Sequence, residues 1–258
     1  MSYPSLKITF LGTGTSSGVP MIACDCGVCT SFNKRDKRLR SSILVQSSNT
    51  TLVVDTGPDF RYQMLRENVK HLDAVVFTHP HKDHLAGLDD IRAFNFFTKK
   101  PMQIYADSLT EEAVRRDFYY AFSDTRYPGT PDLNMNTINH DPFMVGDIPV
   151  VPIPVWHLRM PVMGFRFGKF TYITDANKID DESKEKIMGS EVLVLNALRR
   201  QKHISHFNLD EAVELAQELK VKTAYFTHIS HQLGLHNEVE SELPEGIHLA
   251  YDHLVIEL

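Results

Sequence analysis

The side chains best suited to chemistry lie in the stretch Thr78-His79-Pro80-His81-Lys82-Asp83-His84. Its last six residues hold three imidazoles and one carboxylate, a density that a polar loop with incidental histidines rarely reaches. Neutral imidazole nitrogen and carboxylate oxygen together suit zinc, manganese or iron. The stretch therefore predicts a metal site.

The local backbone should bring these side chains to one side. His79 and His81 are two residues apart, so on extended backbone their side chains leave the same face. Pro80 disfavours helical backbone at the residue before it, which favours this arrangement. The apolar run Asp73–Phe77 has the length and composition of a buried strand, so we expect the histidines where that strand ends.

A second group of potential ligands is Cys24, Cys26 and Cys29, the only three cysteines of the chain. An odd number at this spacing is a poor disulfide framework, particularly in a reducing compartment. Three thiolates in a CxCxxC pattern can bind one zinc ion, and the alternative is a set of thiols without metal. Structural zinc requires four ligands, so a fourth must come from elsewhere in the chain.

The composition is that of a globular protein with a substantial core, since 42% of the 258 residues are hydrophobic and 23% are charged. A formal net charge of −6 repels a polyanion such as RNA on average, and Asp36 interrupts the densest basic stretch, Lys34–Arg40. The N-terminus lacks the pattern of a secretory signal, and no apolar run approaches the ~20 residues needed to cross a bilayer. We expect a cytoplasmic protein that acts on a small substrate, with no role for nucleic acid or a membrane.

Strand-like and helix-like segments alternate along the chain. Strands are predicted at Leu6–Leu11, Ser42–Gln46, Thr51–Asp55, Asp73–Thr78, Val150–Val155, Met163–Phe167, Phe170–Thr174, Val192–Asn196, Thr223–Thr227 and Leu254–Glu257. Helices are predicted at Asp59–Asn68, with Asp59 as its cap, at Thr110–Phe122 and at Leu209–Leu219. The glycine-rich stretch Gly12–Gly18 is followed by the cysteines rather than by an amphipathic helix, and it predicts a tight turn. The order predicts a layered α/β fold in a single domain, residues 1–258.

These motifs resemble the metallo-β-lactamase superfamily, whose signature is HxHxDH after a short apolar strand. The cysteine cluster and four further stretches are similar to its PhnP-like subgroup of cyclic phosphodiesterases, and more distantly to tRNase Z: Leu11–Pro20, Asp55–Phe60, Gly87–Asp90 and Thr227–His231. The resemblance covers nearly the whole chain. It implies a four-layer αβ/βα sandwich, in which two mixed β-sheets pack between helices and the site lies at one edge of the sheets.

The resemblance also implies a binuclear site with two divalent ions, Mn or Zn, and a hydroxide that bridges them. One ion would take His79, His81 and His157, the other Asp83, His84 and His228, and Asp175 would bind both. His157 and Asp175 each follow a predicted strand. The simpler interpretation of His157 alone is a core histidine, and that of Asp175 alone is a turn residue or a helix cap. Asp55, at another strand end, is expected to orient a metal-bound histidine.

Two further roles rest on the same resemblance. His231, three residues after His228, would complete a Cys₃His structural zinc site, with His236 and Asp25 as weaker candidates. His206 would act on the phosphate or the leaving group as general acid or electrostatic stabiliser, with His203 as the alternative. Asp83 counts with His206 as catalytic.

The expected function is metal-dependent hydrolysis of a small cyclic or diester phosphate. A tRNA 3′-end endoribonuclease is one alternative, although the sequence has no basic extension for tRNA. A non-catalytic metal-binding relative is another, although the intact ligand set argues against it. Flavin-linked di-iron reductases of this fold usually carry glutamate where His81 stands, which favours hydrolysis over redox chemistry. The resemblance to the cyclic phosphodiesterases also implies a homodimer.

Overall fold

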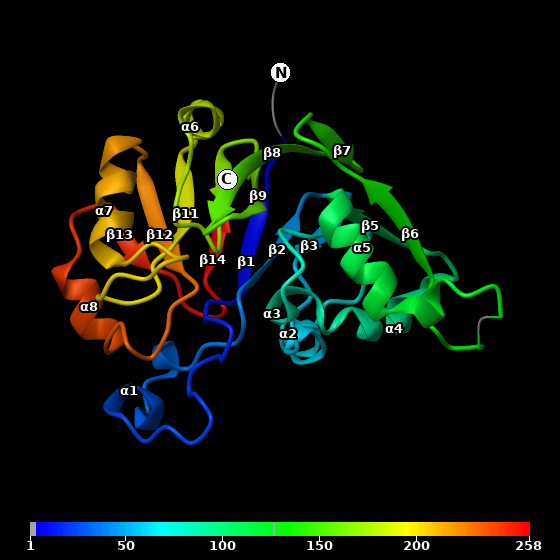
Figure 1. Cartoon of the computed structure of the whole chain (residues 1–258), viewed down its shortest axis with the longest axis horizontal. Coiled ribbons are helices and arrows are strands. Elements are labelled where there is room, and N and C mark those ends of the chain that lie inside the picture. Colours follow the sequence, from blue (N-terminus) through cyan, green and yellow to red (C-terminus); the bar gives the residue numbers. More distant parts are fainter. Residues whose placement is uncertain (1–3, 126) are drawn as a thin grey trace.

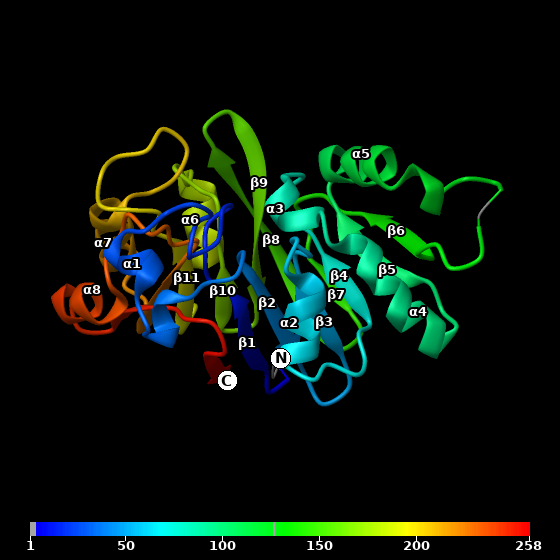
Figure 2. The same ribbon diagram turned by 90° about the horizontal axis from the view of Figure 1, so that it is seen from below.

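Two seven-stranded mixed β-sheets pack face to face, and helices cover their outer surfaces (Figure 1 and Figure 2). The computed structural model describes residues 4–125 and 127–258. In spatial order the first sheet contains β14 (Val255–Glu257), β1 (Lys7–Gly12), β2 (Ser42–Gln46), β3 (Thr51–Val54), β4 (Ala74–Val76), β5 (Met102–Ala106) and β6 (Leu133–Thr137). The second sheet contains β13 (Ile247–Leu249), β12 (Thr223–Thr227), β11 (Val192–Asn196), β10 (Phe170–Tyr172), β9 (Met160–Phe167), β8 (Ile148–His157) and β7 (Phe143–Val145).

The helices divide between the two outer faces. Those on the first sheet are α2 (Phe60–Arg66), α3 (Lys82–Leu85), α4 (Arg92–Thr98) and α5 (Ser108–Asp117). Those on the second sheet are α6 (Asp181–Ile187), α7 (Leu209–Glu218) and α8 (His236–Glu242). The short helix α1 (Gly27–Thr30) lies apart from both sheets, in the blue loop at the bottom of Figure 1. Among the described residues, no helix combines the length and apolar character needed to cross a membrane.

Three cores hold these layers together. Strand β3 illustrates the division, because Leu52 and Val54 face the core between the sheets while Val53 faces the helices outside the first sheet. Phe165 of the second sheet closes the central core from the other side. Leu195 belongs to the third core, beneath the helices of the second sheet. Three cores separate four layers, which confirms the predicted αβ/βα sandwich.

The carboxyl ends of several strands meet at one edge of the sandwich. Strands β3 and β4 are parallel neighbours, and so are β10, β11 and β12. Strand β8 is antiparallel to β9, which is antiparallel to β10, so β8 runs in the same direction as β10. In open α/β sheets the crevice outside the carboxyl ends is the usual place for a ligand. The residues that follow these strands are therefore placed to form a site.

Two local predictions differ from the structure. Helix α5 ends at Asp117 instead of Phe122, and the aromatic segment Tyr119–Ala121 forms a separate 3₁₀ turn. Asp59 precedes α2 but, among the described residues, its side chain forms no capping hydrogen bond. Its carboxylate instead accepts a 2.8 Å hydrogen bond from the backbone of Arg40 and pairs with the Arg40 guanidinium at 3.2 Å. Arg40, which is 19 residues away in the chain, therefore binds this carboxylate in place of the N-terminus of α2.

The predicted tight turn, Gly12–Gly18, packs against the loop that follows β12. The Thr15 N–H donates to the Ile229 carbonyl at 3.1 Å, and the Ile229 N–H donates to the Thr13 carbonyl at 2.9 Å. A side chain at Gly14 would come within 2.9 Å of the Arg38 carbonyl, so this close approach requires glycine. The turn thus supports the loop that carries His228.

Candidate metal-binding sites

The HxHxDH motif joins β4 to α3 at the edge where the strand ends meet. His79 follows the strand, His81 precedes the helix on extended backbone (φ −65°, ψ 150°), and Asp83 and His84 lie in its first turn. The His79 ring lies 4.7 Å from that of His81 and 4.1 Å from that of His84, measured between ring centroids. His79 and His84 are buried, while His81 faces solvent. The three histidine rings of the motif therefore line one small volume, with His79 and His84 at its buried side and His81 at its solvent side.

Two distant strand ends complete this volume. Asp175 lies beyond β10, and its Oδ2 is 3.2 Å from His84 Nε2 while its Oδ1 is 3.1 Å from His228 Nε2. His228 follows β12, and its Nε2 is also 3.6 Å from Asp83 Oδ2. One side of the Asp175 carboxylate thus faces the motif and the other faces the second sheet.

The backbone at these strand ends is unusual. Asp55, Asp175 and His228 each have a positive φ, at 66°, 56° and 55°. Non-glycine residues in this left-handed region store strain of order 1–3 kcal/mol each, and such strain clusters at functional sites. Three such residues around one cluster indicate that the fold holds these side chains in place for a purpose other than stability.

Buried hydrogen bonds fix the orientation of the ligands. Asp55 Oδ2 lies 2.7 Å from His84 Nδ1, and Thr78 donates to the same carboxylate from its backbone (2.9 Å) and its hydroxyl (2.8 Å). These hydrogen bonds turn His84 Nε2 towards Asp83 and Asp175. Asp55 is thus placed as a carboxylate that orients a metal-binding histidine. His157 Nδ1 lies 3.1 Å from the Asp175 carbonyl oxygen in the same way.

The charges of the cluster suit a cation. Burial alone would raise the pKa of Asp175, but the neighbouring His228 and His84 rings and the hydrogen bonds from His206 and His84 outweigh it and hold that pKa well below its usual range. Burial likewise opposes ionisation of Asp83, yet His84 and His228 keep its pKa low. Burial lowers the pKa of His79 well below its usual value. Burial opposes the charge on His84, but Asp175, Asp83 and Asp55 raise the pKa of His84 well above its usual value. The site therefore offers charged carboxylates, and a metal ion that binds there displaces the proton of His84.

Unpartnered nitrogen atoms show that the residues fit a metal. Among the described residues, His79 Nε2 and both ring nitrogens of His228 are buried without a hydrogen-bond partner. A buried polar atom without a partner costs free energy, and a bound cation would remove that cost. The donor atoms of Asp83, His84, Asp175 and His228 all lie within 4.8 Å of one another, as one ion requires.

Asp175 also belongs to a second group of possible ligands, together with His157 and His206. The His157 ring lies 5.2 Å from His81 and 4.6 Å from His206. His206 Nε2 is 3.1 Å from Asp175 Oδ1, and burial lowers the pKa of His206 to about 4. The structure thus places the residues predicted for the binuclear site near one another. Among the described residues, however, His79 and His81 belong to neither group of donor atoms at ligand distance, whereas His206 belongs to the group of His157 and Asp175.

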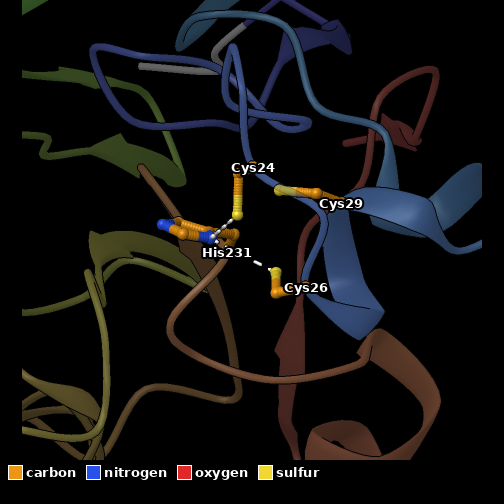
Figure 3. A group of neighbouring side chains, drawn as sticks. All are labelled: Cys24, Cys26, Cys29 and His231. Carbon is orange, nitrogen blue, oxygen red and sulfur yellow. Dashed lines mark hydrogen bonds between the residues drawn. The ribbon is translucent and has the colours of Figure 1, made fainter.

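The cysteine cluster forms a separate site in the loop that carries α1 (Figure 3). The donor atoms of Cys24, Cys26, Cys29 and His231 lie within 4.8 Å of one another, and His231 Nδ1 is 3.3 Å from Cys24 Sγ and 3.4 Å from Cys26 Sγ. A hydrogen bond from the backbone of Cys29, followed by one from His231, lowers the pKa of Cys26 to about 6, which favours the metal-binding thiolate. Burial raises the pKa of Cys29 to about 11.

The two weaker candidates for the fourth ligand lie outside this group. His236 Nδ1 is instead 3.1 Å from the buried Arg38 guanidinium, and the His236 backbone N–H donates to Asp36. Asp25 is exposed between the cysteines. Four donors of the Cys₃His type suit tetrahedral zinc.

Several supporting residues were not predicted. The Asn196 side chain accepts from the Ala176 N–H at 2.7 Å and donates to the Ala176 carbonyl at 2.9 Å, which fixes the residue next to Asp175. Ser205 Oγ lies 3.1 Å from His206 Nδ1. An asparagine that ends an apolar strand is a weak signal for such a role, and the serine has none.

The two packed sheets and the residues at their shared edge are those of the metallo-β-lactamase fold, with candidate metal-binding residues where the strands end. A family model described as a beta-lactamase superfamily domain matches residues 50–229, and the chain belongs to this family. A crystal structure described as a new diphosphatase from the PhnP family superposes with a TM-score of 0.93 and 41% identity, over 98% of this chain and 97% of that one. The predicted resemblance to the PhnP-like subgroup is confirmed.

More distant structures share the fold alone. A zinc-bound PqqB from Methylobacterium extorquens has a TM-score of 0.78 at 18% identity, over 98% of this chain and 100% of that one. The short form of human tRNase Z has a TM-score of 0.69 at 18% identity, over 97% and 98% of the two chains.

Two curated relatives carry other names. The octanoyltransferase of Porphyromonas gingivalis is 36% identical over 96% of this chain, but the match spans only 51% of that protein. The coenzyme PQQ synthesis protein B of Methylorubrum extorquens is 32% identical over 74% of this chain and 72% of that protein. The chain thus spans about half the length of the octanoyltransferase.

Proposed function

We propose that the protein is a binuclear metal-dependent phosphodiesterase that hydrolyses a small cyclic or diester phosphate. The observation that carries the proposal is the position of Asp175, which belongs to two candidate ligand groups, one with Asp83, His84 and His228 and the other with His157 and His206. A carboxylate shared in this way is the arrangement that two neighbouring ions require.

Two sets of residues would hold the two ions. His79, His81 and His157 would hold one ion, Asp83, His84 and His228 the other, and Asp175 both. Two divalent ions supply an acidified water and neutralise charge at a phosphoryl group. The ligands are buried or half-buried except His81, so the site opens to substrate on the His81 side.

His206 is the group of this chain suited to act on the substrate itself. Its Nε2 points at Asp175, so a phosphoryl group bound beside that carboxylate would lie within reach of the imidazole. There the Nε2 proton can be donated to the leaving oxygen or to a phosphoryl oxygen, which fits general-acid or electrostatic assistance.

The similarity to a PhnP-family diphosphatase at 41% identity supports a phosphorus centre as the target. The net charge of −6 on these 258 residues favours a small molecule over RNA. Human tRNase Z shares only the fold, so it gives no support to tRNA processing. Half of the octanoyltransferase lies outside the match, so acyl transfer is not assigned to this chain.

The test is hydrolysis of bis-p-nitrophenyl phosphate by protein loaded with Mn²⁺ or Zn²⁺, followed by a panel of cyclic nucleotides, cyclic ribose phosphates, organic diphosphates and precursor tRNA. We expect turnover of a small diester and none of precursor tRNA. Cleavage confined to precursor tRNA would establish the endoribonuclease alternative. A metal-loaded protein that cleaves nothing in the panel would match the non-catalytic alternative.

A further inference from the structure

The turn that joins β8 to β9 has an unusual residue at its first position. His157 pairs with Met160, so Leu158 and Arg159 form a two-residue hairpin turn. Leu158 has a φ of 58°. The favoured two-residue turns require a positive φ at this position, where glycine, asparagine or aspartate is usual because the Cβ of other residues clashes with the backbone. Leucine at this position therefore costs stability.

Packing offsets little of this cost. Leu158 is 52% exposed, whereas Met160, on the other side of the turn, packs against the core beneath the helices of the second sheet. A strained residue is expected where the surrounding structure holds it for function, and such residues cluster at ligand sites. The combination of a strained backbone and an exposed apolar side chain points to a role of Leu158 outside folding.

A second exposed aliphatic residue is tied to this turn. Ile204 is 73% exposed and lies in the loop between β11 and α7. The Asn177 side chain joins the two segments, because its Oδ1 accepts from the Leu158 N–H at 2.7 Å and its Nδ2 donates to the Ile204 carbonyl at 3.1 Å. Figure 2 shows the green hairpin and the yellow loop projecting at the upper edge of the molecule. One asparagine thus fixes the spacing of the two aliphatic residues.

Each of these three segments also carries a residue of the candidate metal site. His157 directly precedes the turn, Asp175 lies two residues before the asparagine, and His206 lies two residues after the isoleucine. His157 Nδ1 is 3.1 Å from the Asp175 carbonyl oxygen, and the ring centroids of His157 and His206 are 4.6 Å apart. The two aliphatic residues therefore lie at the edge of the metal site.

We propose that Leu158 and Ile204 form an apolar rim that binds the organic group of a phosphoester, and that the substrate carries an apolar group of about the size of an aromatic ring. Contact with such a group removes apolar surface of both partners from water, which a bare sugar phosphate would not do. The phosphoryl centre would lie at the metals while the organic group lies on the rim. The substrate class rests on the proposed phosphodiesterase function.

Two diesters that share a leaving group test the rim. Bis-p-nitrophenyl phosphate carries a second aromatic ester group, and methyl p-nitrophenyl phosphate carries a methyl group in its place. Leu158→Gly should lower kcat/KM for the aryl diester by ~10-fold, chiefly through KM, and change that for the methyl diester by less than ~3-fold. Ile204→Ala should shift the same ratio in the same direction. Equal losses on both diesters would overturn the proposal.

Two further variants separate apolar contact from size. Leu158→Asn keeps a side chain of similar size that tolerates a positive φ, but it is polar, so it should lose the aryl preference as the glycine variant does. Leu158→Met keeps an apolar side chain and should retain the preference. An asparagine variant that discriminates between the diesters as well as the wild type does would contradict an apolar rim.

Thermal unfolding separates this role from a structural one. Leu158→Gly removes the strain, so its Tm should be unchanged or higher by up to roughly 4 °C while the aryl preference is lost. Lys220→Gly is the matched control, because Lys220 has a φ of 50° at an exposed position after α7. It should leave the kinetics unchanged. A lower Tm of Leu158→Gly together with an unchanged aryl preference would show that the leucine serves folding, and would overturn the proposal.

A binding experiment separates failure of the rim from failure of the proposed function. Calorimetry measures the Kd of phenylphosphonate and of methylphosphonate, neither of which is hydrolysed, on zinc-loaded protein. We expect the wild type to bind phenylphosphonate ~10-fold more tightly and Leu158→Gly to lose this difference. This binding preference without hydrolysis of any diester would support the rim and overturn the phosphodiesterase function. Diester hydrolysis with no aryl preference in either assay would overturn the rim alone.

Discussion

The two candidate metal sites meet within one loop, where His228 and His231 stand three residues apart, yet they are built in opposite ways. The histidine and carboxylate site lies on strand ends that two sheets position, and His79, His84, Asp175 and His228 are each 1–2% exposed. Hydrogen bonds to Asp55 and Thr78 orient its ligands before any ion binds. The fold therefore positions the ligands of this site without a bound metal.

The cysteine site lies in a long loop that belongs to neither sheet (Figure 2). Its α-helix, α1, has four residues, and among the described residues this helix lacks a side-chain cap. Cys24 and Cys26 are half-buried, and their side-chain contacts are with His231. We therefore expect a bound zinc ion to stabilise the conformation of this loop. The comparison shows two kinds of metal site: one whose ligands the fold positions in advance, and one whose loop depends on the metal for its stability. Each of the following predictions tests this difference.

The largest effect is expected from Asp175→Ala. The variant should lose most of the metal of the strand-end site and more than ~10³-fold of the activity, because in the proposed site both ions would depend on this carboxylate. Metal content by mass spectrometry and the rate on bis-p-nitrophenyl phosphate measure the two losses. Asp181→Ala, at a fully exposed carboxylate, is the matched control. Full metal and full activity in Asp175→Ala would show that this carboxylate does not bridge.

His206→Ala should lower kcat by ~10²–10⁴-fold while the bound metal is retained. The loss should be smaller with p-nitrophenolate as leaving group if His206 donates a proton, and similar for all leaving groups if it stabilises charge. Because His206 lies at ligand distance from Asp175, metal analysis is decisive here. Loss of an ion from the variant would show that His206 is a ligand.

Asp55→Asn tests whether the fold orients the ligands in advance. The amide would face His84 Nδ1 with a donor or withdraw one of the acceptors that Thr78 uses, so His84 should be misdirected. We expect a loss of ~10–100-fold in activity or metal affinity. Asp59→Asn, whose carboxylate pairs with Arg40 away from the site, is the control. An unchanged metal affinity in Asp55→Asn would argue that the ion orients His84 by itself.

Cys26→Ser should have the smallest effect on activity and a clear effect on stability. The variant should lose close to one equivalent of zinc, and a loss of ~3 kcal/mol would lower Tm by roughly 6–12 °C for a chain of this size. The activity of the folded fraction should fall by less than ~10-fold, which corresponds to 1.4 kcal/mol. Asp25→Asn changes the same loop without removing a ligand and should keep its zinc. Unchanged zinc content in Cys26→Ser would refute the structural site.

The local parts of both sites could be predicted from the sequence. His79, His81, Asp83 and His84 are so close in the chain that any continuation of the preceding strand gathers them, and the cysteines are gathered by the same proximity. The buried strands around them were also visible, because apolar runs of this length have few alternatives. The shortest missed elements, β13, β7 and α3, are three or four residues long. The five-residue strands β5 and β6 and the seven-residue helices α4, α6 and α8 were missed as well.

The long-range parts were decided by the tertiary structure. His157, Asp175 and His228 lie up to about 150 residues from the motif, and only the packing of the two sheets brings the ends of β8, β10 and β12 beside the end of β4. The sequence left His203 and His206 as rivals for one role, whereas the structure places their Nδ1 atoms 3.2 Å apart and puts His206 Nε2 beside Asp175. Contacts of this kind depend on the direction of a side chain, which sheet register and packing determine and which the order of residues in the chain does not contain.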